Sequence, residues 1–121
     1  MAEDSKVTKG VRSTFVELTE EQPNPTGGVS ELVNSTINWQ NGIVEDGVQN
    51  GAFVEDVIQA AVERLQYFQN SKFNCRENSV AITKLEEALM WLDYRTKKRV
   101  SQGVENTYEV HDASQNGSPK T

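Results

Sequence analysis

The spacing of the hydrophobic positions changes near the middle of the chain, and this change separates two structurally different halves. From about Phe53 onward, apolar residues recur every three to four positions, which is the period of an amphipathic helix. The apolar stripe of this first predicted helix consists of Phe53, Val57, Ile58, Ala61, Leu65 and Phe68. Glu55 and Asp56 fall in its first turn, where negative charge complements the helix dipole. The pair Asn70-Ser71 predicts the end of the helix.

A second, longer helix is predicted from about Glu77 to Gln102, and Gly103 is a suitable residue to end it. Its apolar stripe consists of Val80 or Ala81, Leu85, Ala88 or Leu89, and Leu92. The segment Ser71–Cys75 between the two helices is short, and a short connection forces consecutive helices to pack antiparallel. The second half of the chain is therefore predicted to form a helical hairpin.

The first half of the chain has the pattern of short strands and loops. Val11–Leu18 is rich in β-branched and aromatic residues, and Ser35–Gln40 alternates between apolar and polar positions, so both are predicted strands. Two prolines and a glycine pair mark Glu20–Gly28 as a loop. Ser30–Val33 is interpreted as a helical turn. Asn41-Gly42 is a strong turn signal, for which a β-hairpin is one outcome.

These patterns predict an α+β fold, in which a small N-terminal antiparallel β element is followed by an antiparallel two-helix hairpin. The predicted parts are a disordered segment at residues 1–9, a β and loop region at 10–52, the helical hairpin domain at 53–105 and a partly disordered tail at 106–121. Within that tail, Thr107–Val110 is a candidate edge strand or an arm onto a neighbouring subunit. Of the 121 residues, 36% are hydrophobic, against about 45–50% in an average globular domain. So thin a core indicates loose chain ends, an oligomer that completes the core, or both, and we expect both.

Charge is distributed unevenly along a chain whose net charge is −6. Residues 1–60 carry ten acidic and three basic side chains, whereas residues 64–99 carry eight basic and four acidic ones. The local excess of positive charge in the hairpin suits a small anionic ligand. An acidic protein without an extended positive face is, by contrast, a poor binder of long nucleic acids.

The residues available for chemistry argue against an enzyme or a metal protein. Cys75 is the single cysteine and His111 the single histidine, so one chain forms neither a disulfide nor a thiolate metal cluster. Cys75 is predicted to be a small buried hydrophobic residue, since its thiol has no histidine base within the domain. Glu86-Glu87 and Asp93 are interpreted as a solvated helix face with nearby basic partners. No catalytic residue, metal or cofactor is expected.

The sequence also gives no sign of a membrane protein. No apolar run approaches the about 20 residues that cross a bilayer, and the N-terminus lacks the apolar core of a signal peptide. We therefore expect a soluble, cytoplasmic protein without a membrane partner.

A string of residues around the predicted helical connection resembles a hairpin found in phage anti-defence proteins. It runs from Tyr67 to Asn78 (Tyr-Phe-Gln-Asn-Ser-Lys-Phe-Asn-Cys-Arg-Glu-Asn) and continues through Ala81–Leu92 to Arg95-Thr96, Arg99 and Gly103-Val104-Glu105. The segment Ile37–Gly42 (Ile-Asn-Trp-Gln-Asn-Gly) is similar too. Over residues 36–105 the chain resembles the first-described Thoeris anti-defence family and the related anti-CBASS family of cyclic-oligonucleotide sponges. Asn106 and Tyr108 depart from the glycine and histidine that the family often has there.

The resemblance implies a phage protein of the host cytoplasm that forms a symmetric oligomer and sequesters an immune messenger without degrading it. That messenger is a cyclic ADP-ribose isomer made by Thoeris TIR-domain proteins. The family's pocket uses an aromatic at the end of the first helix, an asparagine at the start of the second, and arginines one and two turns before that helix ends. The matching positions here are Phe68, Asn78, Arg95 and Arg99. Arg76, beside a helix N-terminus where anions bind, is a second-rank candidate.

The chemistry of these side chains fits such a ligand, although each also has an ordinary structural role. Phe68 offers a flat face for purine stacking, or it is the last core residue of its helix. Arg95 and Arg99 share one helix face and suit bidentate contacts with phosphate, or they complement the dipole at a helix C-terminus. Asn78 donates to a ribose or an adenine edge, or it caps its helix.

Neighbouring residues are assigned to structure, and two other functions stay open. Lys97 and Lys98 are interpreted as solvated, and Trp91 and Tyr94 as core or subunit-interface residues. The first alternative function keeps the fold and binds CBASS-type cyclic di- or trinucleotides. The second is a phage protein-interaction module that uses the hairpin for assembly alone. An enzyme that hydrolyses the messenger is disfavoured, because the sequence offers no candidate catalyst.

Overall fold

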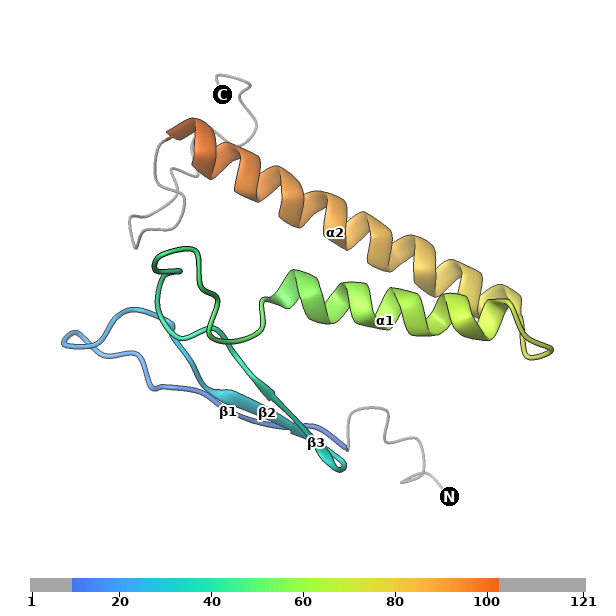
Figure 1. Ribbon diagram of the computed structural model, residues 1–121, viewed down its shortest axis with the longest axis horizontal. Helices are drawn as coiled ribbons and strands as arrows, with labels where there is room; N and C mark the ends of the chain where they lie inside the picture. The colour runs from blue at the N-terminus through green and yellow to red at the C-terminus, as the bar shows by residue number, and fades with distance from the viewer. Residues whose placement is uncertain (1–9, 103–121) are drawn as a thin grey trace. The chain divides into compact units, whose positions relative to one another are not determined.

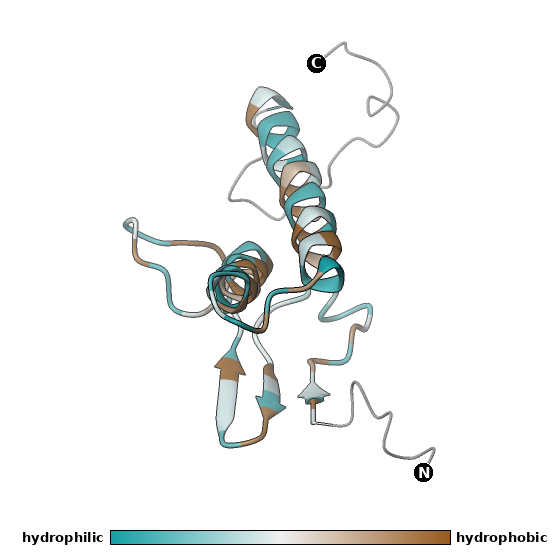
Figure 2. Ribbon diagram, turned by 90° about the vertical axis from the view of Figure 1, so that its right-hand side faces the viewer, coloured by the Kyte–Doolittle hydropathy of each residue, from teal (hydrophilic) through white to brown (hydrophobic). Residues whose placement is uncertain are grey.

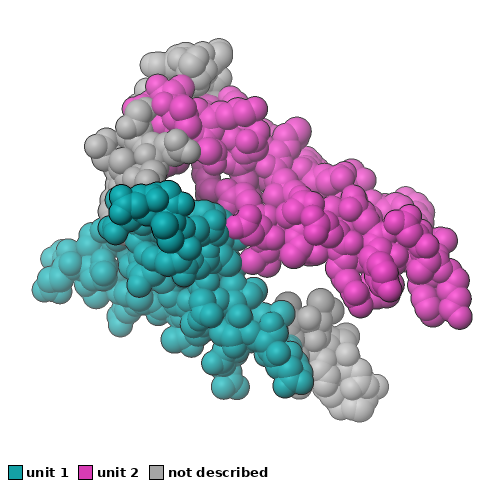
Figure 3. All heavy atoms as spheres, viewed as in Figure 1, with its two compact units in different colours: residues 1–53 teal, residues 54–121 magenta. Residues whose placement is uncertain are grey.

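The computed structural model describes residues 10–102, and the chain divides into two compact units, residues 1–53 and 54–121 (Figure 3). The expected disorder of residues 1–9, the expected stop at Gly103 and the expected roles of the tail lie outside the described residues. A small antiparallel sheet in the first unit and two helices in the second confirm the predicted α+β class (Figure 1).

The first unit contains three short strands, β1 Arg12–Thr14, β2 Val29–Leu32 and β3 Ser35–Asn38. They form one antiparallel sheet in the order β1-β2-β3, and β1 is shorter than the strand predicted at Val11–Leu18. Ser13 of β1 and Ile37 of β3 both lie opposite Ser30 of β2. Residues directly opposite one another point to the same face of a sheet, so this row of three side chains is shared across all three strands.

The helical turn predicted at Ser30–Val33 is wrong, because this segment lies in the central strand and in the turn that follows it. Backbone pairing with a strand on either side holds β2 extended, and such nonlocal pairing outweighs the local preference of four residues. The hairpin turn is Val33-Asn34, where Asn34 has a φ of 59°. Asparagine tolerates this left-handed conformation better than most residues. Asn41-Gly42 follows β3 and does not join two paired strands.

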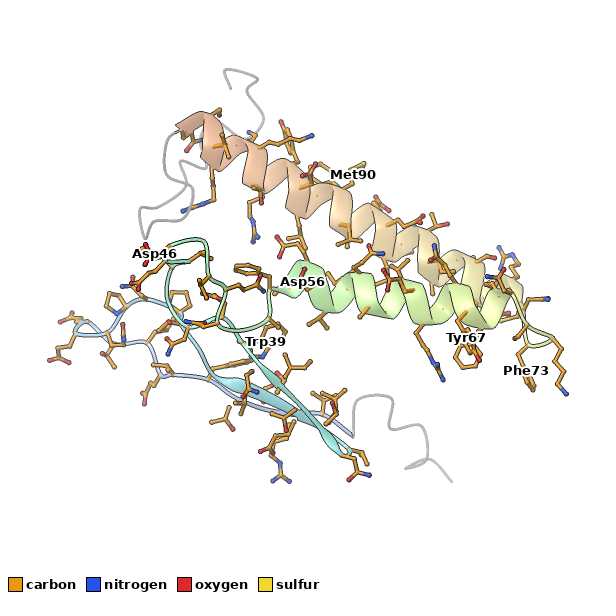
Figure 4. All side chains as sticks on the ribbon, in the orientation of Figure 1. Trp39, Asp46, Asp56, Tyr67, Phe73 and Met90 are labelled. Carbon is orange, nitrogen blue, oxygen red and sulfur yellow. The ribbon has the colours of Figure 1, made fainter. Side chains whose placement is uncertain are left out.

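A buried hydroxyl group anchors the sheet. Ser30 is 5% exposed, and its Oγ accepts a hydrogen bond from Trp39 Nε1 at 2.8 Å and shares another with Ser13 Oγ at 2.7 Å. A buried polar atom costs free energy unless it is hydrogen-bonded, so these two partners are what allow a serine at this position. They also fix the indole of Trp39, which directly follows β3 (Figure 4).

The loop after β3 has its two ends held together by side-chain amides. Asn50 N and Gly51 N both donate to Gln40 Oε1, at 2.9 and 3.1 Å. Asn41 N donates to Asn50 Oδ1 at 2.8 Å, and Asn50 Nδ2 returns a bond to Asn41 O at 3.0 Å. Gly51 comes so close to the neighbouring chain that a Cβ built on it would lie 2.6 Å from the carbonyl of Trp39. This contact leaves no room for a side chain at Gly51.

The second unit is an antiparallel hairpin of α1 Val54–Gln69 and α2 Arg76–Gln102 (Figure 1). The start of each helix and the end of α1 agree with the predicted spans to within one residue. Gln69, the last residue of α1, closes the connection, because its Nε2 donates to Cys75 O at 2.9 Å and its Oε1 accepts from Cys75 N at 3.0 Å. A third bond joins Gln69 Nε2 to Ser79 Oγ at 2.8 Å. Neither described helix is long and apolar enough to cross a membrane.

The hairpin has a thin apolar core. Val62, with 2% of its surface exposed, is the single buried hydrophobic residue in the described part of the chain. The half-buried apolar residues are Val57, Ile58, Leu65 and Phe68 on α1, and Ala81, Ile82, Leu85, Ala88, Leu89 and Leu92 on α2. The predicted stripe was wrong at two positions. Phe53 is exposed and precedes α1, and Ala61 is exposed while its neighbour Val62 is buried, because a period of 3.6 residues drifts relative to any fixed spacing. Hydrophobic and hydrophilic residues are interspersed along α2 (Figure 2).

Candidate functional site

The five residues that the sequence singles out lie at the two ends of the helical hairpin. Phe68 belongs to the last turn of α1, and Arg76 and Asn78 to the first turn of α2, so these three form a loop-end group. Arg95 and Arg99 lie in the C-terminal part of α2 and form an open-end group. At about 1.5 Å of rise per residue, the stretch of α2 from Asn78 to Arg95 is about 26 Å long. One chain therefore does not bring the two groups together.

In the loop-end group, Phe68 is half-buried and has a cationic neighbour. Arg64 Cζ lies 5.1 Å from the ring centroids of both Phe68 and Tyr67. The two rings meet edge to face with their centroids 6.2 Å apart, and Tyr67 is exposed (Figure 4). Sequence reasoning missed Arg64 and Tyr67. The signal was present, because these residues and Phe68 have the i, i+3, i+4 spacing of neighbours on a helix surface.

Asn78 is half-buried, whereas Arg76 is exposed. Asn78 shares a helix face with Leu85, Leu92 and Arg99, which follow it at intervals of seven residues. The same face of α2 thus carries an amide at one end, leucines in the middle and a guanidinium at the other end. Within residues 10–102, no hydrogen bond joins the Asn78 side chain to the start of α2.

In the open-end group, Arg95 makes an ion pair across the hairpin. Arg95 Nη2 lies 3.0 Å from Oε2 of Glu55, which belongs to the first turn of α1. The Arg95 side chain is 54% exposed and that of Glu55 33%, so solvent screens the pair in part. Arg99 is half-buried. Sequence reasoning gave Glu55 a role in the helix dipole alone, because no local pattern reveals a partner forty positions away.

The two lysines between these arginines have different environments. Lys97 is exposed and pairs with Asp93 at 3.1 Å along the same helix, as expected of a solvated position. Lys98 is 3% exposed, and its Nζ lies 5.1 Å from the ring centroid of Tyr94. The interpretation of Lys98 as solvated is therefore wrong. The ring of Tyr94 attracts the ammonium group and is one of the neighbours of this lysine.

Cys75 is exposed, which corrects the prediction of a buried residue. The hairpin uses its backbone and not its thiol, since Gln69 bonds both the N–H and the carbonyl of Cys75. The described part of the chain contains no group of three or more His, Cys, Asp or Glu residues that is placed to hold a metal ion. The arrangement offers an aromatic face, an amide and guanidinium groups, whose chemistry suits a base and an anion.

Apolar side chains are exposed on the middle of α2. Met90 and Trp91 are each 60% exposed and Tyr94 is 43% exposed (Figure 4). The rings of Trp91 and Tyr94 meet edge to face with centroids 6.0 Å apart. Clustered exposed aromatics of this kind are typical of contact surfaces. We refer to Met90, Trp91 and Tyr94 as the α2 band.

Two comparisons with known proteins bear on this arrangement. The family model described as Acb2/Tad1, hairpin domain, matches residues 31–97, which is more than half of the chain. The curated protein Thoeris anti-defense 1 of Bacillus phage SBSphiJ7 is 59% identical over 75 residues, which cover 62% of this chain and 53% of that protein. The chain therefore spans about half the length of this curated relative. The family match includes every predicted site residue except Arg99, which lies two positions beyond its end.

Proposed function

The chain belongs to the family of the Acb2/Tad1 hairpin domain, as its sequence predicts, and we propose that it is a phage anti-defence protein that sequesters a nucleotide immune signal. It binds the signal in the host cytoplasm and holds it intact, so that the host effector is never switched on. The observation that carries this proposal is the presence, on one hairpin, of an aromatic–amide group and a two-arginine group. Neither binding nor retention requires a nucleophile, a metal or a general base.

The proposed ligand is a cyclic ADP-ribose isomer of the kind made by Thoeris TIR-domain proteins. The name of the relative, Thoeris anti-defense 1, supports this choice. An adenine stacks on the half-buried ring of Phe68, an interaction worth about 1–3 kcal/mol per base. Arg95 and Arg99 offer guanidinium forks to the pyrophosphate. Asn78 donates to a ribose or to the adenine edge, and Arg76 adds positive charge beside it.

The distance between the two groups argues that two copies of the chain build each site. The about 26 Å of helix between Asn78 and Arg95 is much longer than a molecule of one adenine, two riboses and one pyrophosphate. A ligand held by both groups therefore needs the loop-end group of one copy and the open-end group of another. A symmetric dimer contains two such sites.

An antiparallel pairing of α2 with α2 of a second copy supplies this geometry. With a two-fold axis near residues 87–88, Asn78 of each copy lies opposite the Arg95–Arg99 segment of the other, because paired positions are equidistant from the axis. Met90 and Trp91 lie within about one helical turn of that crossing, but on a different face of α2 from Asn78 and Arg99.

Recovery of the bound nucleotide tests the proposed function. The purified protein is mixed with the TIR-derived cyclic ADP-ribose isomer, separated from unbound nucleotide and heat-denatured, and the released material is identified by mass spectrometry. We expect unchanged messenger in stoichiometric amount. A degraded product would identify an enzyme instead. Protein that retains no nucleotide would refute the proposal.

A second candidate keeps the same site and changes the ligand to CBASS-type cyclic di- or trinucleotides. The observation that favours it is the family description itself, which joins Acb2 with Tad1 under one hairpin domain. Stacking and guanidinium contacts serve these ligands equally well. The same recovery experiment with cyclic dinucleotides and trinucleotides, alone and in competition with the cyclic ADP-ribose isomer, decides between the two ligands or finds both.

A further inference from the structure

The ion pair between Glu55 and Arg95 differs in kind from two other ion pairs of α2. Lys84–Glu87, at 4.0 Å, and Asp93–Lys97, at 3.1 Å, each join neighbours along one helix. Glu55–Arg95, at 3.0 Å, joins residues forty positions apart on two helices. It fixes the direction of a guanidinium group that carries part of the proposed phosphate contact. Asp56, labelled in Figure 4, marks the turn of α1 from which Glu55 reaches across.

The contact with Glu55 uses part of the Arg95 guanidinium group, and its other N–H donors can still bind a ligand. A guanidinium has five N–H donors, and the hydrogen bond to Glu55 is made by Nη2. Long side chains such as arginine lose conformational entropy when a ligand immobilises them. A carboxylate that already holds Arg95 reduces this loss at the moment of binding. The same carboxylate also removes one unit of net positive charge from the open-end group, which weakens its attraction for an anion.

We propose that Glu55 is a positioning residue, which holds Arg95 in the direction needed for the phosphate groups of the ligand without touching the ligand itself. The inference rests on the proposed function and adds to it a residue of α1 that supports α2. The opposite role, a carboxylate that competes with the ligand for Arg95, predicts an effect of the opposite sign. Removal of Glu55 weakens binding in the first case and strengthens it in the second.

The test compares Glu55→Ala, Glu55→Gln, Arg95→Ala and the double variant Glu55→Ala/Arg95→Ala by calorimetric titration with the cyclic ADP-ribose isomer. Glu55→Gln keeps a side-chain oxygen that accepts the Arg95 hydrogen bond and removes the negative charge. Asp93→Ala is the matched control, because it breaks an exposed carboxylate ion pair of nearly the same length on α2. Thermal unfolding of every variant and the Arg95 Nε–H signal in ligand-free NMR spectra report the structural consequences separately.

For a positioning role, Glu55→Ala raises the Kd about five- to tenfold, which corresponds to about 1–1.4 kcal/mol. Glu55→Gln and Asp93→Ala stay within about twofold of the parent, and in the Arg95→Ala background the loss of Glu55 has no further effect, as a double-mutant cycle requires of coupled residues. Parental or tighter binding by Glu55→Ala overturns the positioning role alone. If Glu55→Ala raises the Kd by the same factor in the Arg95→Ala background as in the parent, the positioning role is overturned as well. A parent protein that binds no nucleotide refutes the proposed function.

Discussion

The side-chain amide of Gln69 bonds both the N–H and the carbonyl of Cys75, at 3.0 and 2.9 Å, and so closes the connection between α1 and α2. One side chain thus satisfies two backbone groups at the start of α2, where helical N–H groups lack partners within the helix. The loop-end group depends on this closure, because Phe68 precedes the connection and Arg76 and Asn78 follow it.

Replacement of Gln69 by alanine is expected to destabilise the hairpin by about 1–2 kcal/mol, since each lost hydrogen bond contributes about 0.5–1.5 kcal/mol. For a domain of this size, the melting temperature should fall by about 4–8 °C per kcal/mol. Circular dichroism at 222 nm during heating measures the melting temperature. Gln59→Ala is the control, because Gln59 bonds Glu63 on the exposed surface of α1 at 3.1 Å and closes no connection. Equal melting temperatures for the two variants would contradict the role of Gln69.

Loss of the Ser30 hydroxyl is expected to destabilise the first unit by about 1–3 kcal/mol, because Trp39 Nε1 then lacks its acceptor in a partly buried site. Ser13→Ala leaves the Trp39 bond in place and should cost less. The chain has two tryptophans, so urea unfolding is followed by Trp39 fluorescence in a Trp91→Phe background. A larger effect of Ser13→Ala than of Ser30→Ala would show that the indole bond is not the important one.

Alanine substitutions at Gly51 and Gly47 separate a steric clash from the strain of a positive φ. Gly51→Ala places a Cβ 2.6 Å from the carbonyl of Trp39, so the loop after β3 must open. Gly47 has a φ of 71° and nothing within 4 Å of a built Cβ, so Gly47→Ala carries conformational strain alone, about 1–2 kcal/mol. We expect Gly51→Ala to raise amide hydrogen exchange at Asn50 and Gly51 sharply. Gly47→Ala should leave exchange at Asn50 nearly unchanged, and the reverse order would contradict the packing argument.

Mixing two variants with weakened binding tests whether two copies build each site. Phe68→Ala and Arg95→Ala should each lower affinity for the cyclic ADP-ribose isomer at least tenfold, because each loses one contact in every site. In a mixed dimer, one site combines both substitutions and the other has neither. After subunit exchange, about a quarter of the sites should therefore recover parental affinity, as titration of the equimolar mixture would measure. A site contained within one copy would recover none.

The helices were predictable because each signal is local and long. Apolar residues every three to four positions over sixteen and twenty-seven residues leave little choice of structure. β2 was misread because a four-residue strand is decided by its partners, which lie up to nineteen positions away.

The candidate site shows the same division between local and nonlocal signals. Arg95 was found through a resemblance and through its i, i+4 spacing from Arg99, both of which are visible in the sequence. The bond from Arg95 to Glu55 is visible only when α1 and α2 are packed. Burial was equally hard to predict for Lys98, because a lysine at a helix end is usually solvated.

The face of α2 from Asn78 to Arg99 sets both the distance and the relative direction of these two residues. Because the helix is continuous, its length fixes the separation of the loop-end and open-end groups. Its seven-residue repeat places Asn78 and Arg99 on one face. One residue inserted between Leu85 and Leu92 would turn Arg99 by about 100° away from Asn78, whereas seven would restore the direction and move the arginines about 10 Å further along. In the proposed dimer the length of α2 therefore sets the distance between the two sites, and an insertion that is not a multiple of seven would turn Arg99 out of line with Asn78 in both of them.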